Sequence, residues 1–276
     1  MASGTVTLSP GERRRLTPLA AALARVEATE AARLEVVAGT LPRGARAGLL
    51  AGTFNPLTRA HAALAVAGHR AGCDRVVLAM APRSLDKERL ERAHPLDRLD
   101  WVRAWARRHP WAAVALSSRP LLVDMAEALG RLTGGQVTLL LGTDKAAQLV
   151  DPRYYEDLEA ALARLGETAS LLVAERAGHP PARLPLRAGR LPTPAWTPGR
   201  SSTEVREAAR RREPLDELVP SAIARAIART RAFDDDPDPY LGRARQLDAL
   251  VSAMEGPPRY PGGPRQRAGP RDHDTA

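Results

Sequence analysis

From about residue 46 onward, short apolar segments alternate with amphipathic helical patterns, and this alternation restricts the fold more than any other feature. Each apolar segment is short enough to be a single buried strand; the segments lie at 47–51, 75–81, 112–116, 137–141 and 170–174. Helical patterns lie between or after them at about 58–71, 95–108, 121–132 and 154–165. Near-continuous apolar strands that alternate with helices are typical of a parallel sheet buried on both sides. We therefore predict an α/β domain in which a parallel sheet of about five strands is covered by helices on both faces.

Composition and pattern divide the chain into three parts. Residues 1–45 predict a helical N-terminal extension. Residues 46–232 form the predicted α/β domain, which includes a Pro/Gly-rich stretch at 177–200 and two helices after it. Residues 233–276 are rich in Asp, Pro, Gly and Arg. Apart from a short helix that ends near Met254, we expect this third part to be a disordered, low-complexity tail.

Composition excludes several classes of protein. The 276 residues carry a formal net charge of +9, from 41 Lys+Arg and 32 Asp+Glu, but only Lys87 and Lys145 are lysines. This arginine bias, with abundant Ala, Gly and Pro, is typical of a GC-rich genome, so the charge is weak support for nucleic-acid binding. The lone Cys73 excludes an intramolecular disulfide framework and a cysteine-based zinc site. No apolar run approaches the ~18 residues of a membrane helix, and the N-terminus lacks a signal-peptide pattern, so we expect a cytoplasmic protein without a membrane partner.

The most informative motif runs from the end of the first predicted strand into the first predicted helix, over residues 52–61 (GTFNPLTRAH). Ligands of parallel sheets bind outside the carboxyl ends of the strands. Gly52 allows close approach of the backbone, and free N–H groups in such a turn suit a phosphate. Thr58 and His61 are three residues apart and share one face of the helix, which favours phosphoryl or nucleotidyl transfer. The alternative is a simple strand–turn–helix with a capping threonine and an incidental histidine.

A second motif, Arg-Ser-Ser-Thr-Glu-Val-Arg at 200–206, follows the Pro/Gly-rich stretch. Ser201 and Glu204 have capping-box spacing, so the motif predicts a helix start. The functional interpretation is a second anion site, made by hydroxyl groups and free N–H groups at this helix N-terminus, with Arg206 one turn along from Ser202.

A third motif, Leu-Gly-Thr-Asp-Lys at 141–145, ends the fourth predicted strand. Gly142 would let a ribose or base approach the backbone, and Asp144 could accept hydrogen bonds from a ribose. The alternative is that Asp144 caps the helix that follows.

Taken together, these motifs resemble the nucleotidyltransferase superfamily with the (H/T)xGH signature, and most of all the nicotinate/nicotinamide mononucleotide adenylyltransferases. The match consists of GTFNPLTRAH, then GTDK with the later DPRYYEDL at 151–158, then SSTEVR at 201–206. It covers about residues 46–230, and the order of the motifs makes it more specific than any one of them. The resemblance implies a Rossmann-like α/β fold and the transfer of AMP from ATP to a mononucleotide phosphate, with release of pyrophosphate.

The resemblance also implies roles for individual residues. His61 would bind the α-phosphate of ATP and stabilise its charge in the transition state, assisted by Thr58. Arg206 would stabilise the leaving pyrophosphate. The other implied contacts come from Gly52, Thr53 and Phe54 in the phosphate-binding turn, Lys87 over the phosphates, Gly142 and Asp144 at the adenosine ribose, and Ser202 and Thr203 at the β- and γ-phosphates. Mg²⁺ would arrive with ATP, and the sequence identifies no metal ligands of its own.

Some positions depart from the family pattern. Ala60 stands where the signature usually has glycine. The region that carries a Thr-x-Asp-Thr-like signature in bacterial nicotinate enzymes here reads Leu-Leu-Val-Asp-Met at 121–125, so the phosphate acceptor stays open. Trp196 is a candidate to stack on a pyridine ring, whereas Trp101 and Trp105 fit core positions. Other superfamily enzymes, namely a phosphopantetheine adenylyltransferase or a cytidylyltransferase-like enzyme, and an inactive nucleotide-binding protein remain alternatives.

Overall fold

The computed structural model describes residues 6–82, 93–181 and 183–255 of the chain. Its strands are β1 (Leu34–Ala38), β2 (Ala47–Ala51), β3 (Arg75–Met80), β4 (Ala112–Ser117), β5 (Val137–Gly142), β6 (Ala169–Ala174) and β7 (Ala188–Arg190). Its α-helices are α1 (Pro10–Glu27), α2 (Arg59–Arg70), α3 (Pro95–Ala106), α4 (Leu122–Thr133), α5 (Thr143–Leu149), α6 (Leu158–Thr168), α7 (Ser202–Arg210), α8 (Ser221–Thr230) and α9 (Asp238–Ser252). Two short 3-10 helices, η1 (Pro152–Tyr154) and η2 (Thr197–Gly199), complete the described elements.

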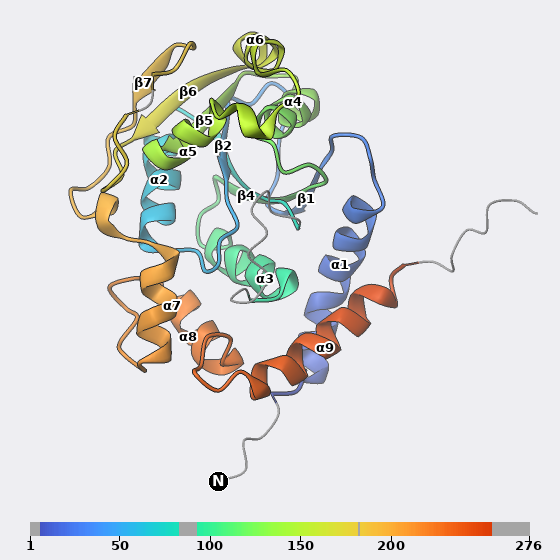
Figure 1. Ribbon diagram of the computed structural model, residues 1–276. Coiled ribbons are helices and arrows are strands. Elements are labelled where there is room, and N and C mark those ends of the chain that lie inside the picture. Colours follow the sequence, from blue (N-terminus) through green and yellow to red (C-terminus); the bar gives the residue numbers. More distant parts are fainter. Residues whose placement is uncertain (1–5, 83–92, 182, 256–276) are drawn as a thin grey trace, which may run out of the picture.

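The strands form one mostly parallel sheet in the order β1-β4-β3-β2-β5-β6-β7 (Figure 1). The five predicted strands are β2 to β6, and every neighbouring pair among them is parallel. The predicted count was too low, because the described residues place one more strand at each edge. β7 extends the sheet in parallel, whereas β1 pairs antiparallel with β4. The N-terminal extension contains the expected helix, α1, and also contributes β1, which the sequence did not predict.

Helices cover both faces of the sheet, as the near-continuous apolar strands predicted. Side chains along a strand alternate between faces, so Leu49 of β2 joins one hydrophobic core and Leu50 the other. The Leu49 side packs against α4, α5 and α6. The Leu50 side is thicker, because it packs against α2 and α3 and also takes in apolar residues of α1, α7, α8 and α9. This two-faced arrangement is the Rossmann-like fold that the motifs implied.

The C-terminal segment is more ordered than its composition predicts. Helix α9 lies along α1 on the outside of α3 (Figure 1), and its Arg243 is only 2% exposed. The Arg243 guanidinium donates to Asp97 of α3 at 2.7 Å and to Glu12 of α1 at 3.1 Å. Tyr240 donates its hydroxyl to the same Asp97 at 3.0 Å. The short helix expected to end near Met254 is present as α9. The Pro/Gly/Arg stretch at 256–276, where disorder was expected, lies outside the described residues.

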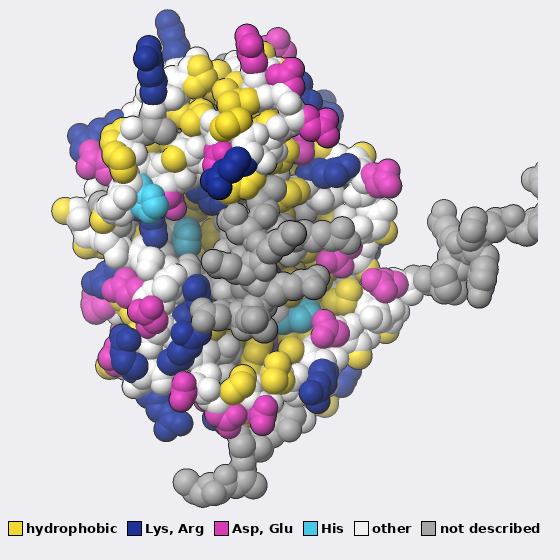
Figure 2. Space-filling model, in the orientation of Figure 1, with side chains coloured by type: hydrophobic (Ala, Val, Ile, Leu, Met, Phe, Trp, Pro, Cys, Tyr) yellow, Lys and Arg dark blue, Asp and Glu magenta, His cyan; other side chains and the backbone are white. Residues whose placement is uncertain are grey.

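No helix in the described parts of the chain combines the length and the apolar character that crossing a bilayer requires. On the face of the molecule seen in Figure 2, Lys and Arg side chains are scattered among Asp and Glu side chains and form no single stripe.

Candidate active site

The first and third predicted motifs come together at the carboxyl edge of the sheet. β2 pairs with β3 on one side and with β5 on the other, so the order of the strands reverses in direction beside β2. In open parallel sheets, ligands bind in the crevice at such a switch point. The turn after β2 carries residues 52–58, and the start of α5 after β5 carries Gly142 and Asp144.

The turn after β2 is held in a fixed shape by buried groups. Phe54 is 1% exposed and has a φ of +44°, in the left-handed region. A Cβ atom at Gly52 would lie 3.0 Å from this ring, so a larger residue there would push against Phe54. Arg98 of α3 donates to the Thr53 carbonyl at 2.7 Å, and Asn55 accepts from the Ala93 N–H at 3.0 Å. The buried Phe54 ring and the hydrogen bonds at Thr53 and Asn55 therefore hold the turn in one shape.

Thr58 and His61 cap helix α2 reciprocally. The Thr58 hydroxyl accepts from the His61 N–H at 3.2 Å, and His61 Nδ1 accepts from the Thr58 N–H at 3.0 Å. The Phe54 ring meets the imidazole edge-on, with 5.3 Å between the ring centroids. Because Nδ1 accepts a backbone hydrogen bond, the proton of the neutral ring lies on Nε2. The capping alternative and the functional interpretation are thus compatible, since the cap fixes which nitrogen can donate to a ligand.

The surroundings keep His61 neutral. Desolvation by burial, together with the positive charges of Arg176 and Lys145, lowers its pKa from 6.5 to about 4, although Asp144 acts in the opposite direction. At neutral pH the imidazole is therefore an uncharged Nε2–H donor. Ala60, which replaces the usual glycine, is 2% exposed and lies in the first turn of α2.

The second motif joins the first across a long sequence separation. Ser201 caps α7, with its hydroxyl accepting from the Glu204 N–H at 3.1 Å, as the capping-box spacing predicts. The next residues contact the turn after β2: Ser202 donates its hydroxyl to the Pro56 carbonyl at 3.0 Å, and Arg206 donates to the Asn55 carbonyl at 3.1 Å. Arg206 also donates to the Thr203 hydroxyl at 3.2 Å. The start of α7 is thus fastened directly to the predicted phosphate-binding turn.

The third motif has a tight geometry at the end of β5. Gly142 is the N-cap of α5 without a side-chain cap, so Asp144 does not cap this helix. Instead, the Asp144 carboxylate folds back over Gly142, where a Cβ atom would lie 2.5 Å from its Oδ1. Arg176, which follows β6, pairs with Asp144 at 3.5 Å and donates to the Arg200 carbonyl at 2.9 Å. Arg176 thus links the second and third motifs, a role that no sequence motif marked.

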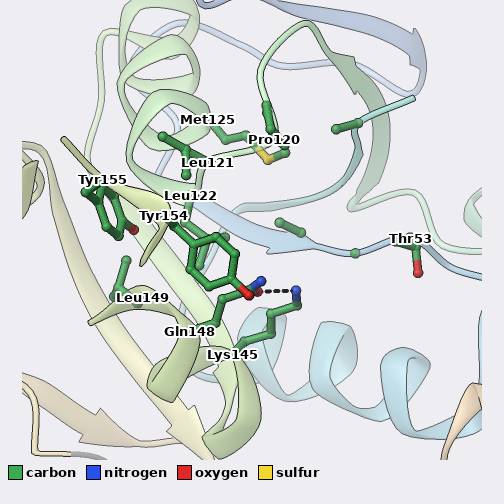
Figure 3. A pocket seen from close by; sticks show the side chains of 13 residues that line it. Thr53, Pro120, Leu121, Leu122, Met125, Lys145, Gln148, Leu149, Tyr154 and Tyr155 are labelled. Atoms are coloured by element: carbon green, nitrogen blue, oxygen red, sulfur yellow. Dashed lines mark hydrogen bonds between the residues drawn. The ribbon is translucent and has the colours of Figure 1, made fainter. Parts of the chain in front are cut away.

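A cleft opens beside the turn on the side of α4 and α5 (Figure 3). Its walls combine backbone of the turn with apolar and aromatic side chains: Ala51, Gly52, Thr53, Ala81, Pro120, Leu121, Leu122, Met125, Lys145, Gln148, Leu149, Tyr154 and Tyr155. Tyr154 and Tyr155 belong to the DPRYYEDL segment, and burial beside Asp124 raises the pKa of Tyr155 to about 12, so its hydroxyl stays protonated. Ala51, Ala81, Pro120, Gln148 and Leu149 were not marked by any motif, because such residues look the same in a core and in a cleft.

A solved structure with the same architecture is the Plasmodium falciparum nicotinic acid mononucleotide adenylyltransferase complexed with APC, which superposes with a TM-score of 0.51 at 12% sequence identity. The match covers 68% of this chain and 97% of that chain. The chain shares the fold of this adenylyltransferase. The resemblance inferred from the motifs is thereby confirmed for the fold.

A putative nicotinate-nucleotide adenylyltransferase from Vibrio parahaemolyticus also aligns, with a TM-score of 0.46, 13% identity, and coverage of 69% of this chain and 96% of that chain. No protein-family model and no curated protein sequence matches the chain.

The remaining predicted residues have separate outcomes. Lys87 lies outside the described residues. Trp101 and Trp105 are 1% and 4% exposed and belong to the core, as predicted. Trp196 is 46% exposed and does not line the cleft of Figure 3. Within the described parts of the chain, no three His, Cys, Asp or Glu side chains lie together as a metal site requires.

Proposed function

We propose that the protein is an ATP-dependent adenylyltransferase that joins AMP to nicotinate or nicotinamide mononucleotide and releases pyrophosphate. The observation that carries this proposal is the junction of motifs around the turn after β2. There a neutral His61 with its Nε2–H available for donation lies beside a turn to which Ser202 and Arg206 of α7 are hydrogen-bonded. Such a junction suits a triphosphate whose α-phosphate faces His61 and whose outer phosphates face α7.

The reaction is an in-line displacement at phosphorus. An oxygen of the acceptor phosphate attacks the α-phosphorus of ATP, a new P–O bond forms, and the bond between the α-phosphorus and its oxygen bridge to the β-phosphorus breaks. The electron pair leaves with pyrophosphate, and no covalent enzyme intermediate is needed. Catalysis then depends on positioning and on neutralising charge. His61 donates from Nε2 to an α-phosphate oxygen, and Thr58 fixes the orientation of the ring.

The other predicted residues have complementary roles. Arg206, with Ser202 and Thr203, would hold the β- and γ-phosphates, so the guanidinium supports the leaving pyrophosphate. Gly142 and Asp144 would hold the adenosine ribose at the end of β5. Gly52, Thr53 and Phe54 shape the turn, and Lys87 is proposed as a further phosphate contact.

Mg²⁺ enters as part of the substrate, bound to the phosphates of ATP. The described residues contain no cluster of carboxylates or histidines that would hold a resident ion. The groups proposed to bind the charged nucleotide are N–H, hydroxyl and guanidinium groups, which would leave the metal ion to the phosphates.

The cleft beside the turn supports a flat heterocyclic acceptor. Tyr154, Tyr155, Leu121 and Met125 line it, and such side chains favour stacking on a planar ring. This lining favours a pyridine mononucleotide over the flexible, chain-like phosphopantetheine. The turnover panel described below distinguishes nicotinate mononucleotide from nicotinamide mononucleotide.

The test is a turnover panel. The protein is incubated with ATP and Mg²⁺ and, in separate reactions, with nicotinate mononucleotide, nicotinamide mononucleotide or 4′-phosphopantetheine, while pyrophosphate release is followed. We expect release with one of the pyridine mononucleotides. CTP in place of ATP tests the cytidylyltransferase alternative. Absence of pyrophosphate release with every acceptor would refute the enzyme proposal and leave a nucleotide-binding protein.

A further inference from the structure

Lys145 lies where the cleft meets the phosphate-binding turn. It comes from the first turn of α5 and lines the same cleft as Gly52 and Thr53. Its amine donates to the side-chain carbonyl of Gln148, beside the ring of Tyr154 (Figure 3). Its positive charge also reaches His61, where it helps to lower the pKa of the imidazole. A cationic group therefore sits between the ring-binding wall of the cleft and the residue proposed to bind the α-phosphate.

The helix position of Lys145 does not favour a cation. α5 starts at Thr143, so Lys145 is the third residue of the helix, where the helix dipole favours a carboxylate and disfavours a cation. The hydrogen bond to Gln148 is one that a neutral donor could also make. The chain moreover uses arginine almost throughout, and Lys145 and Lys87 are its only lysines. A residue type that the local helix disfavours, at the wall of a cleft, indicates a ligand contact.

Resting on the proposed function, we propose that Lys145 binds the phosphate of the acceptor and holds its attacking oxygen toward the α-phosphorus of ATP. In the structure, the amine donates to the neutral side-chain amide of Gln148. When the phosphate monoester enters, the ammonium group exchanges the amide oxygen for a phosphate oxygen, which gives a charge-assisted hydrogen bond.

The chemistry explains why a cation is needed there. The acceptor phosphate is a dianion at neutral pH, and it must approach the α-phosphate of ATP, which is itself negative. One ammonium group that pairs with a non-attacking oxygen lowers this repulsion and leaves the attacking oxygen unblocked. His61 acts on the opposite partner, the α-phosphate, so the two side chains divide the two phosphates between them.

The first test compares binding of a monoester with binding of its dephosphorylated form. Calorimetry is used to measure nicotinate mononucleotide and nicotinate riboside on the wild type and on Lys145→Gln. We expect the wild type to bind the mononucleotide at least about tenfold more tightly than the riboside, and the variant to lose most of that preference while its affinity for the riboside changes by less than about threefold. Arg164→Gln on the exposed side of α6 makes the same change of charge and serves as the control, with no expected effect.

The second test uses turnover and chemical rescue. With a pyridine mononucleotide acceptor, Lys145→Gln is expected to lower kcat/KM for the acceptor about 10²-fold and to change KM for ATP less than about threefold. Lys145→Cys should be equally impaired, and alkylation with 2-bromoethylamine, which restores an amine at nearly the same reach, should recover activity. The native Cys73 is 5% exposed, and treated wild type is the control for its reaction. Thermal melting of Lys145→Gln should be no lower than that of the wild type, because the helix loses an unfavourable charge.

The outcomes separate this inference from the proposed function. Turnover in the wild type together with an unaltered phosphate preference in Lys145→Gln overturns the role of Lys145 and leaves the adenylyltransferase proposal standing. If the wild type shows no turnover but binds the monoester through Lys145, the enzyme proposal fails and the binding site stands. If the wild type shows no preference for the monoester over the riboside, the inference is wrong whatever the turnover.

Discussion

At the scale of single residues, the chemistry of the site concentrates on His61. Its Nδ1 accepts the Thr58 N–H, so only Nε2 can donate to a substrate. Removing this donor from a preorganised site costs about 10²–10³-fold in kcat when it stabilises charge that develops in the transition state. We therefore expect His61→Ala to lower kcat by about that factor, as measured by pyrophosphate release. Circular dichroism of the variant should match the wild type, and near-normal turnover would contradict the assigned role.

The charge state of His61 gives a second prediction at this scale. Burial lowers its pKa from 6.5 to about 4, so the imidazole should be uncharged at every pH near 7. An NMR titration of the imidazole signals of the free protein should show one histidine with a midpoint near pH 4, and His61→Gln should remove that signal. The sign for stability follows: the neutral ring supports folding above pH 6.5, and this contribution is lost as the pH falls from 6.5 toward 4. A midpoint for His61 near 6.5 would show that the ring is solvated.

At the scale of elements, the junction between α7 and the turn after β2 is the critical contact. Arg206 donates to the Asn55 carbonyl, so its guanidinium both fastens α7 and faces the proposed pyrophosphate position. Arg206→Gln should lower kcat/KM for ATP about 10²-fold, because a charge-assisted contact and the alignment of the helix are lost together. Arg211→Gln, at the other end of α7, removes only an exposed ion pair with Glu213 and should leave kcat/KM for ATP within about twofold. Equal losses in both variants would mean that the net charge, rather than this contact, matters.

The elements also show how far the sequence could predict this molecule. Strands β2 to β6 were predictable because parallel strands buried on both faces must be apolar along their length. The edge strands lack this signal: β7 is exposed at all its residues, and β1 carries a charged Glu35 within a segment that was expected to be helical. The sequence predicted a short helix at α9 but not its packing, because the burial of Arg243 depends on Asp97 and Glu12, which are far away in sequence.

The site divides in the same way. The predicted motifs meet because the carboxyl ends of parallel strands share one edge of the sheet. Arg176 was not predictable, since it follows β6 without a recognisable spacing, and the DPRYYEDL segment was recognised without any sign that Tyr154 and Tyr155 line a cleft. Their positions depend on how these elements pack, and this packing cannot be predicted from the sequence pattern.

At the scale of the whole molecule, the two ends of the described chain are tied to the site through α3. Arg243 of α9 donates to Asp97 of α3 and to Glu12 of α1. Arg98, the residue after Asp97, donates to the Thr53 carbonyl in the turn after β2. Both partners of the Arg243–Asp97 pair are 2% exposed at their side chains. Removing one member of such a pair leaves a buried charge without its partner, which costs about 3–5 kcal/mol.

Arg243→Met should therefore lower the melting temperature by roughly 10 °C, as measured by differential scanning calorimetry. The double variant Arg243→Met with Asp97→Asn removes both charges and should recover part of this loss, which a general defect in packing would not allow. Since Arg243 supports α3 without touching substrate, kcat of Arg243→Met well below its melting temperature should stay within about threefold of the wild type. A large loss of kcat in a variant that is still folded would show that the contacts of Arg243 with α1 and α3 determine the geometry of the turn after β2.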